Sequence, residues 1–244
     1  MWRDCSSSSK SRSSYSRGAM HKRTPTHFIA FQIINPEILE EIKDVQRSML
    51  SNNPSLIDVM VPGRLAHITL MVVNLQNYHY RQRAKDALNL CASRLKTEYR
   101  NEPIVLDLAG IGNFRNKVVF AKIHDADKTS DDILQHVHGV VKSSFEEYGI
   151  YTTDTRADFN PHLTLAKTQN DMDISEYVYK DRIDNFFGRE LVNRIQLCAM
   201  GVDGESSYYD VLHQVKFGSR VPSSSHCEKY YTRPAAGADG GAFV

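Results

Sequence analysis

Two short segments of this chain carry the same chemistry in the same order. Residues 66–70 read Ala-His-Ile-Thr-Leu, and residues 161–165 read Pro-His-Leu-Thr-Leu. Alternate side chains of a β-strand share a face, so each His and Thr would share one face while the aliphatic residues enter a core. On adjacent strands, two imidazoles and two hydroxyls would transfer protons on either side of a phosphodiester and hold its oxygens. The candidate catalytic residues are therefore His67, Thr69, His162 and Thr164.

The pair of motifs is more informative than one copy would be. Of the ten histidines in the chain, only His67 and His162 are followed by threonine at the second position. One isolated copy would be explained by a strand-end histidine bonded to a backbone carbonyl. Two copies within apolar strands favour a functional use, because polar residues at core strands need a compensating role.

Composition restricts the class of protein. With 244 residues, of which 41% are hydrophobic, the chain can bury the core of one sizeable domain or of two fused lobes. A net charge of +1 creates no global field for nucleic acid or membranes. The four cysteines form no C-x-x-C pair, and no acidic or histidine cluster has metal-ligand spacing, so we expect no metal and no cofactor. No apolar run approaches the ~20 residues of a membrane span. We therefore expect no membrane partner and a location in the cytoplasm, the nucleus or both.

The two ends differ in composition from the middle. Residues 1–24 hold eight serines and six Lys or Arg without Leu, Ile, Val or Phe, which predicts a disordered tail. Residues 219–244 are rich in Ser, Gly and Ala and predict a second disordered tail. The folded domain is expected over residues 25–218.

The middle alternates between strand and helix patterns. Strands are predicted at 26–34, 66–73, 104–109, 117–123, 159–167, 192–200 and 208–215, and helices after Asn35-Pro36 and at 80–99, 131–148 and 175–186. The order strand, helix, His-x-Thr strand, helix occurs in residues 26–99 and again in 117–186. This weak repeat predicts an α+β fold, bilobal and pseudo-twofold, with two antiparallel-rich sheets around a central cleft.

The paired motifs in this bilobal pattern resemble the two-histidine phosphoesterase superfamily, which includes RNA 2′,3′-cyclic phosphodiesterases and 2′,5′-phosphodiesterases. Further stretches resemble the phosphoesterase domain of the A-kinase anchor protein seven-like family, at residues 110–123, 160–165, 194–200 and 208–209. The resemblance covers about residues 26–217. That family's kinase-docking helix has no counterpart after residue 217, where no apolar stripe occurs, so the regulatory subunit of protein kinase A is not an expected partner.

The resemblance and the residue types together favour a metal-independent phosphodiesterase acting on 2′,5′-linked oligonucleotides or 2′,3′-cyclic phosphates. One imidazole would act as general base and the other, as imidazolium, as general acid; the sequence does not assign these roles. The motif threonines would donate hydrogen bonds to the non-bridging oxygens. Phe114 is a candidate to stack a base and Arg194 a candidate to contact phosphate. The expected partner is an oligoribonucleotide or nucleotide, bound by a monomer.

Two other hypotheses of function remain open. The domain would serve as an AMP- or CMP-type nucleotide sensor if it binds mononucleotides tightly without hydrolysing them. It would serve as a signalling scaffold if the terminal segments alone bind a protein partner.

Overall fold

The computed structural model describes residues 24–125, 133–156, 158–168, 172–201 and 208–218. The tails predicted for residues 1–24 and 219–244 lie outside these residues, except for Thr24. Among the helices in the described ranges, none is both long and apolar enough to span a membrane.

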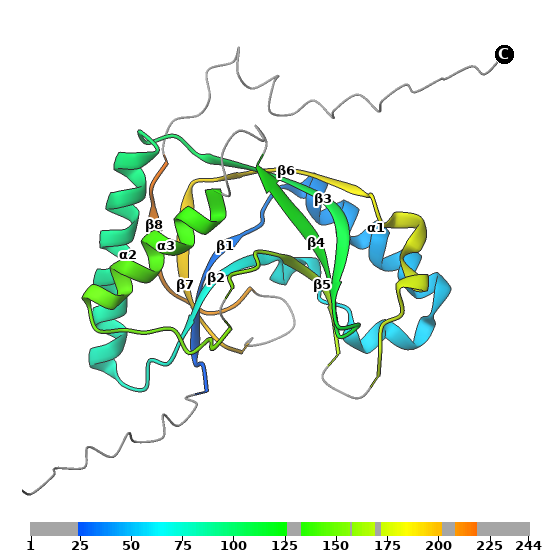
Figure 1. The fold of residues 1–244 in the computed structure, drawn as a ribbon, viewed down its shortest axis with the longest axis horizontal. Coiled ribbons are helices and arrows are strands. Elements are labelled where there is room, and N and C mark those ends of the chain that lie inside the picture. Colours follow the sequence, from blue (N-terminus) through cyan, green and yellow to red (C-terminus); the bar gives the residue numbers. More distant parts are fainter. Residues whose placement is uncertain (1–23, 126–132, 157, 169–171, 202–207, 219–244) are drawn as a thin grey trace, which may run out of the picture.

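The described strands form one sheet in which every neighbouring pair is antiparallel, in the order β6-β3-β4-β5-β2-β1-β7-β8. Figure 1 shows two halves that meet at β2 and β5. We call β2-β1-β7-β8 the first lobe and β5-β4-β3-β6 the second lobe. The strands are β1 (His27–Gln32), β2 (His67–Val73), β3 (Ile104–Phe114), β4 (Val118–Asp125), β5 (Leu163–Lys167), β6 (Phe186–Val192), β7 (Arg194–Ala199) and β8 (Val211–Lys216).

The predicted α+β, bilobal architecture is confirmed. The two lobes are joined where β2 pairs with β5, and Ile68 opposite Leu163 is the register pair at this junction. The two expected sheets are thus hydrogen-bonded into one at their centre. The first His-x-Thr motif therefore lies on central strand β2, and the second lies at the start of central strand β5, with His162 directly before it.

Each lobe is covered by a helix that follows a strand of the other lobe. α1 (Pro36–Asn52) follows β1 but packs on β6, whereas α3 (Ile133–Glu147) follows β4 but packs on β2. α2 (Tyr78–Glu98) packs on α3, β7 and β8. Because each lobe needs a helix from the other half of the sequence to bury its sheet, the lobes are expected to fold together.

Local sequence accounts for where α1 begins and how it packs. The Asn35 side chain accepts a hydrogen bond from the Glu37 amide, and Pro36 occupies the first helical turn. The buried face carries apolar residues three or four positions apart, which is the period of an amphipathic helix. These residues are Ile38, Ile42, Val45 and Met49.

Two differences from the predicted elements lie in the second lobe. The helix expected at 175–186 is a pair of 3-10 turns, Glu176–Val178 and Lys180–Arg182, and strand β6 was not predicted. Gly188, at φ 135°, and the buried Glu190 interrupt the apolar pattern of β6. The glycine is required because a Cβ there would lie 2.9 Å from Cγ1 of Ile38 in α1. Two further 3-10 turns, Pro54–Val59 and Gly63–Leu65, precede β2.

One large apolar cluster runs through both lobes on the helix-covered side of the sheet. A second, smaller cluster of Phe28, Ala30 and Cys198 belongs to the first lobe, with Tyr208 and Tyr209 packed against it. Phe28 and Tyr209 also contact the ring of His67. The smaller cluster therefore supports the side of the sheet that carries the first motif.

Candidate active site

The two motifs face each other across the junction of the lobes. Since Ile68 pairs with Leu163 in antiparallel register, His67 comes opposite Thr164 and Thr69 opposite His162. The four polar residues are partly exposed, while the aliphatic residues between and after them are buried. Each imidazole thus lies across from the hydroxyl of the other motif, as the alternation of strand faces predicts.

The same irregularity occurs in both motif strands. The register of β2 against β1 skips Leu70, and the register of β5 against β4 skips Leu165. Each of these leucines directly follows the threonine of its motif. Such β-bulges sharpen the local twist and turn side chains out of the regular pleat. The bulges show that the repeat inferred from element order is also a repeat of backbone geometry.

Each bulge is held by a polar side chain from the helix exchanged between the lobes. The Leu70 carbonyl accepts a hydrogen bond from Nδ1 of His138 in α3 at 2.8 Å. The Leu165 carbonyl accepts one from Nε2 of Gln46 in α1 at 2.9 Å. Neither His138 nor Gln46 was predicted to support the site, because their partners are backbone atoms far away in the sequence.

Backbone carbonyls hold both motif imidazoles in the same orientation. Nδ1 of His67 lies 2.7 Å from the carbonyl oxygen of Leu65, and Nδ1 of His162 lies 2.8 Å from that of Asn160. A carbonyl only accepts, so each Nδ1 carries the proton and donates. Nε2 is therefore the ring nitrogen that remains for proton transfer in both residues.

Burial lowers the pKa of both histidines below its ordinary value. For His67, desolvation has the largest effect, the hydrogen bond to Leu65 opposes it, and the nearby His162 lowers the pKa further. For His162, desolvation again comes first, opposed by the bond to Asn160, and the cations Arg156 and Lys167 add to the lowering. Both rings are consequently neutral at pH 7 in the free protein.

Aromatic rings flank His162 in the second lobe. Phe114 meets its ring edge-on with centroids 5.0 Å apart, and Phe120 lies 5.4 Å away. The two phenylalanines stack on each other at 4.3 Å. A Cβ at Gly112 would lie 2.7 Å from the Phe120 ring, so the absence of a side chain there leaves room for this stack. Phe114, predicted to stack a base, is thus placed against a motif histidine.

His67 has its own aromatic neighbours in the first lobe. Tyr209 meets it edge-on at 5.2 Å, and Phe28 lies 4.9 Å away. Neither was predicted to belong to the site, although Tyr209 lies in one of the stretches that carried the family resemblance. Each motif histidine therefore packs against a pair of aromatic rings that contact each other.

Arg194, predicted to contact phosphate, lies further from the motifs. It is on β7, which β1 separates from β2, so two strand spacings of about 4.8 Å each lie between it and His67. Its positive charge lowers the pKa of the buried Glu190 carboxyl, against a larger rise from desolvation. Among the described residues, Arg194 donates a hydrogen bond to Oδ1 of Asn193 and interacts with the charge of Glu190, neither of which belongs to a motif.

No group of three or more His, Cys, Asp or Glu side chains that could hold a metal ion occurs among the described residues. The chemical groups that the described site offers are two imidazoles with available Nε2 atoms, two hydroxyls and flanking aromatic rings.

The chain itself matches a known family. A family model described as the AKAP7 2′5′ RNA ligase-like domain matches residues 25–217. The chain belongs to this family. Human A-kinase anchor protein 7 isoform gamma is similar to this AKAP7-like chain, with 29% identity over 205 residues, 80% of this chain and 58% of the relative. The chain thus spans less than two thirds of the length of that relative.

Solved structures share the fold of the AKAP7-like domain. Escherichia coli LigT complexed with 3′-AMP has a TM-score of 0.55 at 19% identity, covering 79% of this chain and 97% of LigT. TT0787 of Thermus thermophilus has a TM-score of 0.55 at 20% identity, covering 80% of this chain and 100% of that one. The AKAP7-like chain therefore shares its fold with LigT and TT0787.

Proposed function

We propose that the domain is a metal-independent phosphodiesterase that acts on RNA-type phosphodiesters, either 2′,5′-linked oligonucleotides or 2′,3′-cyclic phosphates. The observation that carries this proposal is the pairing of the two motifs in antiparallel register, with Nδ1 of each histidine bonded to a carbonyl. The structure of LigT with 3′-AMP supports a ribonucleotide ligand for this fold.

The reaction uses the two imidazoles on opposite sides of the phosphorus atom. Nε2 of one histidine takes a proton from water as the water oxygen attacks phosphorus. The bond from phosphorus to the leaving ribose oxygen breaks, and the second histidine, as imidazolium, gives its Nε2 proton to that oxygen. The hydroxyls of Thr69 and Thr164 donate to the non-bridging oxygens, where negative charge grows in the transition state.

The proposal is tested by incubating the purified chain with 2′,5′-linked oligoadenylate and with 2′,3′-cyclic nucleotides in EDTA. We expect cleavage of at least one of these substrates, because both proton transfers are assigned to side chains. Tight binding of AMP or CMP without cleavage of either substrate would contradict the proposed phosphodiesterase activity and support the nucleotide-sensor function.

The pH dependence of kcat/KM gives a separate prediction. The general base must be neutral and the general acid protonated, so activity rises with pH through one pKa and falls through the other. Since burial lowers the pKa of both His67 and His162, the maximum should lie below the ordinary histidine value of about 6.5. A pH series of kcat/KM measures this maximum; a plateau extending from pH 7 to pH 9 would contradict it.

A further inference from the structure

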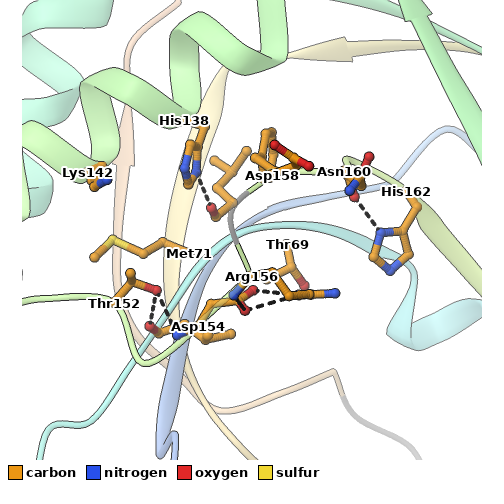
Figure 2. A pocket seen from close by; sticks show the side chains of 13 residues that line it. Thr69, Met71, His138, Lys142, Thr152, Asp154, Arg156, Asp158, Asn160 and His162 are labelled. Carbon is orange, nitrogen blue, oxygen red and sulfur yellow. Dashed lines mark hydrogen bonds and ion pairs between the residues drawn. The ribbon is translucent and has the colours of Figure 1, made fainter. Parts of the chain in front are cut away.

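A cavity of about 110 Å³ opens beside the motif residues, between β2 and α3 (Figure 2). Thr69 and His162 are part of its wall, so whatever enters it is adjacent to the proposed reaction centre. His138 and Lys142 project into it from α3, and Thr152, Asp154 and Arg156 come from the chain that leads to the second motif.

The cavity exists where the twofold repeat breaks down. In the second lobe, the chain before the first motif closes against β5, because the Val61 amide donates to the Leu165 carbonyl at 2.9 Å. In the first lobe, the chain before the second motif contacts β2 nearer the C-terminal end of that strand, where the Thr153 amide donates to the Val72 carbonyl. Val72 is two residues beyond Leu70, the residue equivalent to Leu165. The longer path of this chain leaves the space beside Leu70 open.

The polar groups of the cavity differ in their availability. Arg156 and Asp154 are bound to each other, with Nε of Arg156 3.0 Å from both carboxylate oxygens. Thr152 donates to the Val72 carbonyl. Lys142 is exposed, and no ion pair is recorded for it among the described residues. Among these groups Lys142 is therefore the one available to a ligand, and its ammonium would match an outlying negative charge.

We propose that this cavity binds the ribonucleotide unit next to the scissile linkage, and that Lys142 contacts the phosphate at the far end of that unit. This inference rests on the proposed phosphodiesterase function and deepens it, because it names a chain of at least two linkages as the preferred substrate. A ribose-phosphate unit that extends from a phosphodiester held by Thr69 and His162 enters the cavity directly. Its next phosphate then reaches the mouth of the cavity, where Lys142 is exposed.

The test compares 2′,5′-linked diadenylate with triadenylate, without terminal phosphates. Either linkage of the trimer has a second phosphate on one side, whereas the dimer has none. The wild type should cleave the trimer with a higher kcat/KM than the dimer. Lys142→Glu should lower the trimer-to-dimer ratio by roughly tenfold, because it replaces a phosphate-pairing cation with an anion. The preference of the wild type should also weaken at high salt.

Lys96→Glu, the same substitution on the exposed face of α2, is the matched control and should leave the ratio unchanged. Equal ratios in the wild type and Lys142→Glu would overturn the subsite while leaving the phosphodiesterase intact. If the wild type cleaves neither chain, the assay with 2′,3′-cyclic nucleotides decides the proposed function, and binding decides the subsite. In that case the wild type should bind the trimer with a lower dissociation constant than the dimer, and Lys142→Glu should bind both with similar dissociation constants. Any other result would reject the subsite.

Discussion

Replacing either His67 or His162 with alanine is expected to lower kcat/KM by roughly 10²–10⁴-fold, the usual contribution of a positioned general acid or base. The expectation is the same for both because both rings are oriented alike, each with Nδ1 bonded to a carbonyl two residues earlier. Each variant lacks one of the two proton transfers. The measurement is initial-rate kinetics with EDTA present, on the substrate that the wild type cleaves best.

The double variant distinguishes cooperation from independent effects. If both imidazoles act in one step, the double variant should have a kcat/KM only slightly below that of either single variant, because the effects of substituting residues that act as a unit are not additive. His136→Ala is the matched control, since His136 lies on the exposed face of α3 and contacts Glu98. It should keep the wild-type rate. A double variant with near-normal activity would rule out the two-histidine mechanism.

The sequence predicted how the two motifs are placed because their placement depends on local rules. Alternation along a strand places His67 and Thr69 on one face whatever the rest of the chain does. The repeated spacing at His162 and Thr164 then indicated that two such strands lie in equivalent positions. The fold class followed from the same repeat, since two matching halves need a common centre.

The parts that were missed depend on contacts between distant residues. The bulges at Leu70 and Leu165 exist only in the pairing with neighbouring strands, and no residue type in the motif signals them. The cavity arises because two connecting chains take different paths to equivalent strands, which periodicity cannot show. Strand β6 was missed because Glu190 is buried by a specific set of partners rather than by apolar character.

Those partners make Glu190 a residue whose loss should reduce stability. Its Oε2 accepts hydrogen bonds from the amides of Ile34 and Asn35, at 3.1 and 3.0 Å, where the chain crosses from β1 of the first lobe to α1 on the second. Asn35 in turn donates through Nδ2 to the Arg189 carbonyl of β6 at 2.8 Å. The crossing between lobes is thus anchored to the edge strand of the sheet. Without the carboxylate, two amide donors beneath the start of a helix have no partner.

Glu190→Ala should therefore lower the free energy of unfolding by about 1–3 kcal/mol, since it removes two hydrogen bonds from part-buried amides and each contributes about 0.5–1.5 kcal/mol. Urea denaturation of the full chain measures this loss. Glu190→Gln is the matched control: both amides bond to one carboxylate oxygen, and a carboxamide oxygen can accept from both. Burial raises the pKa of Glu190, so its charge is costly to bury, and the neutral amide should lose far less stability than alanine. Equal losses in the two variants would show that the charge, rather than the acceptor oxygen, holds the crossing in place.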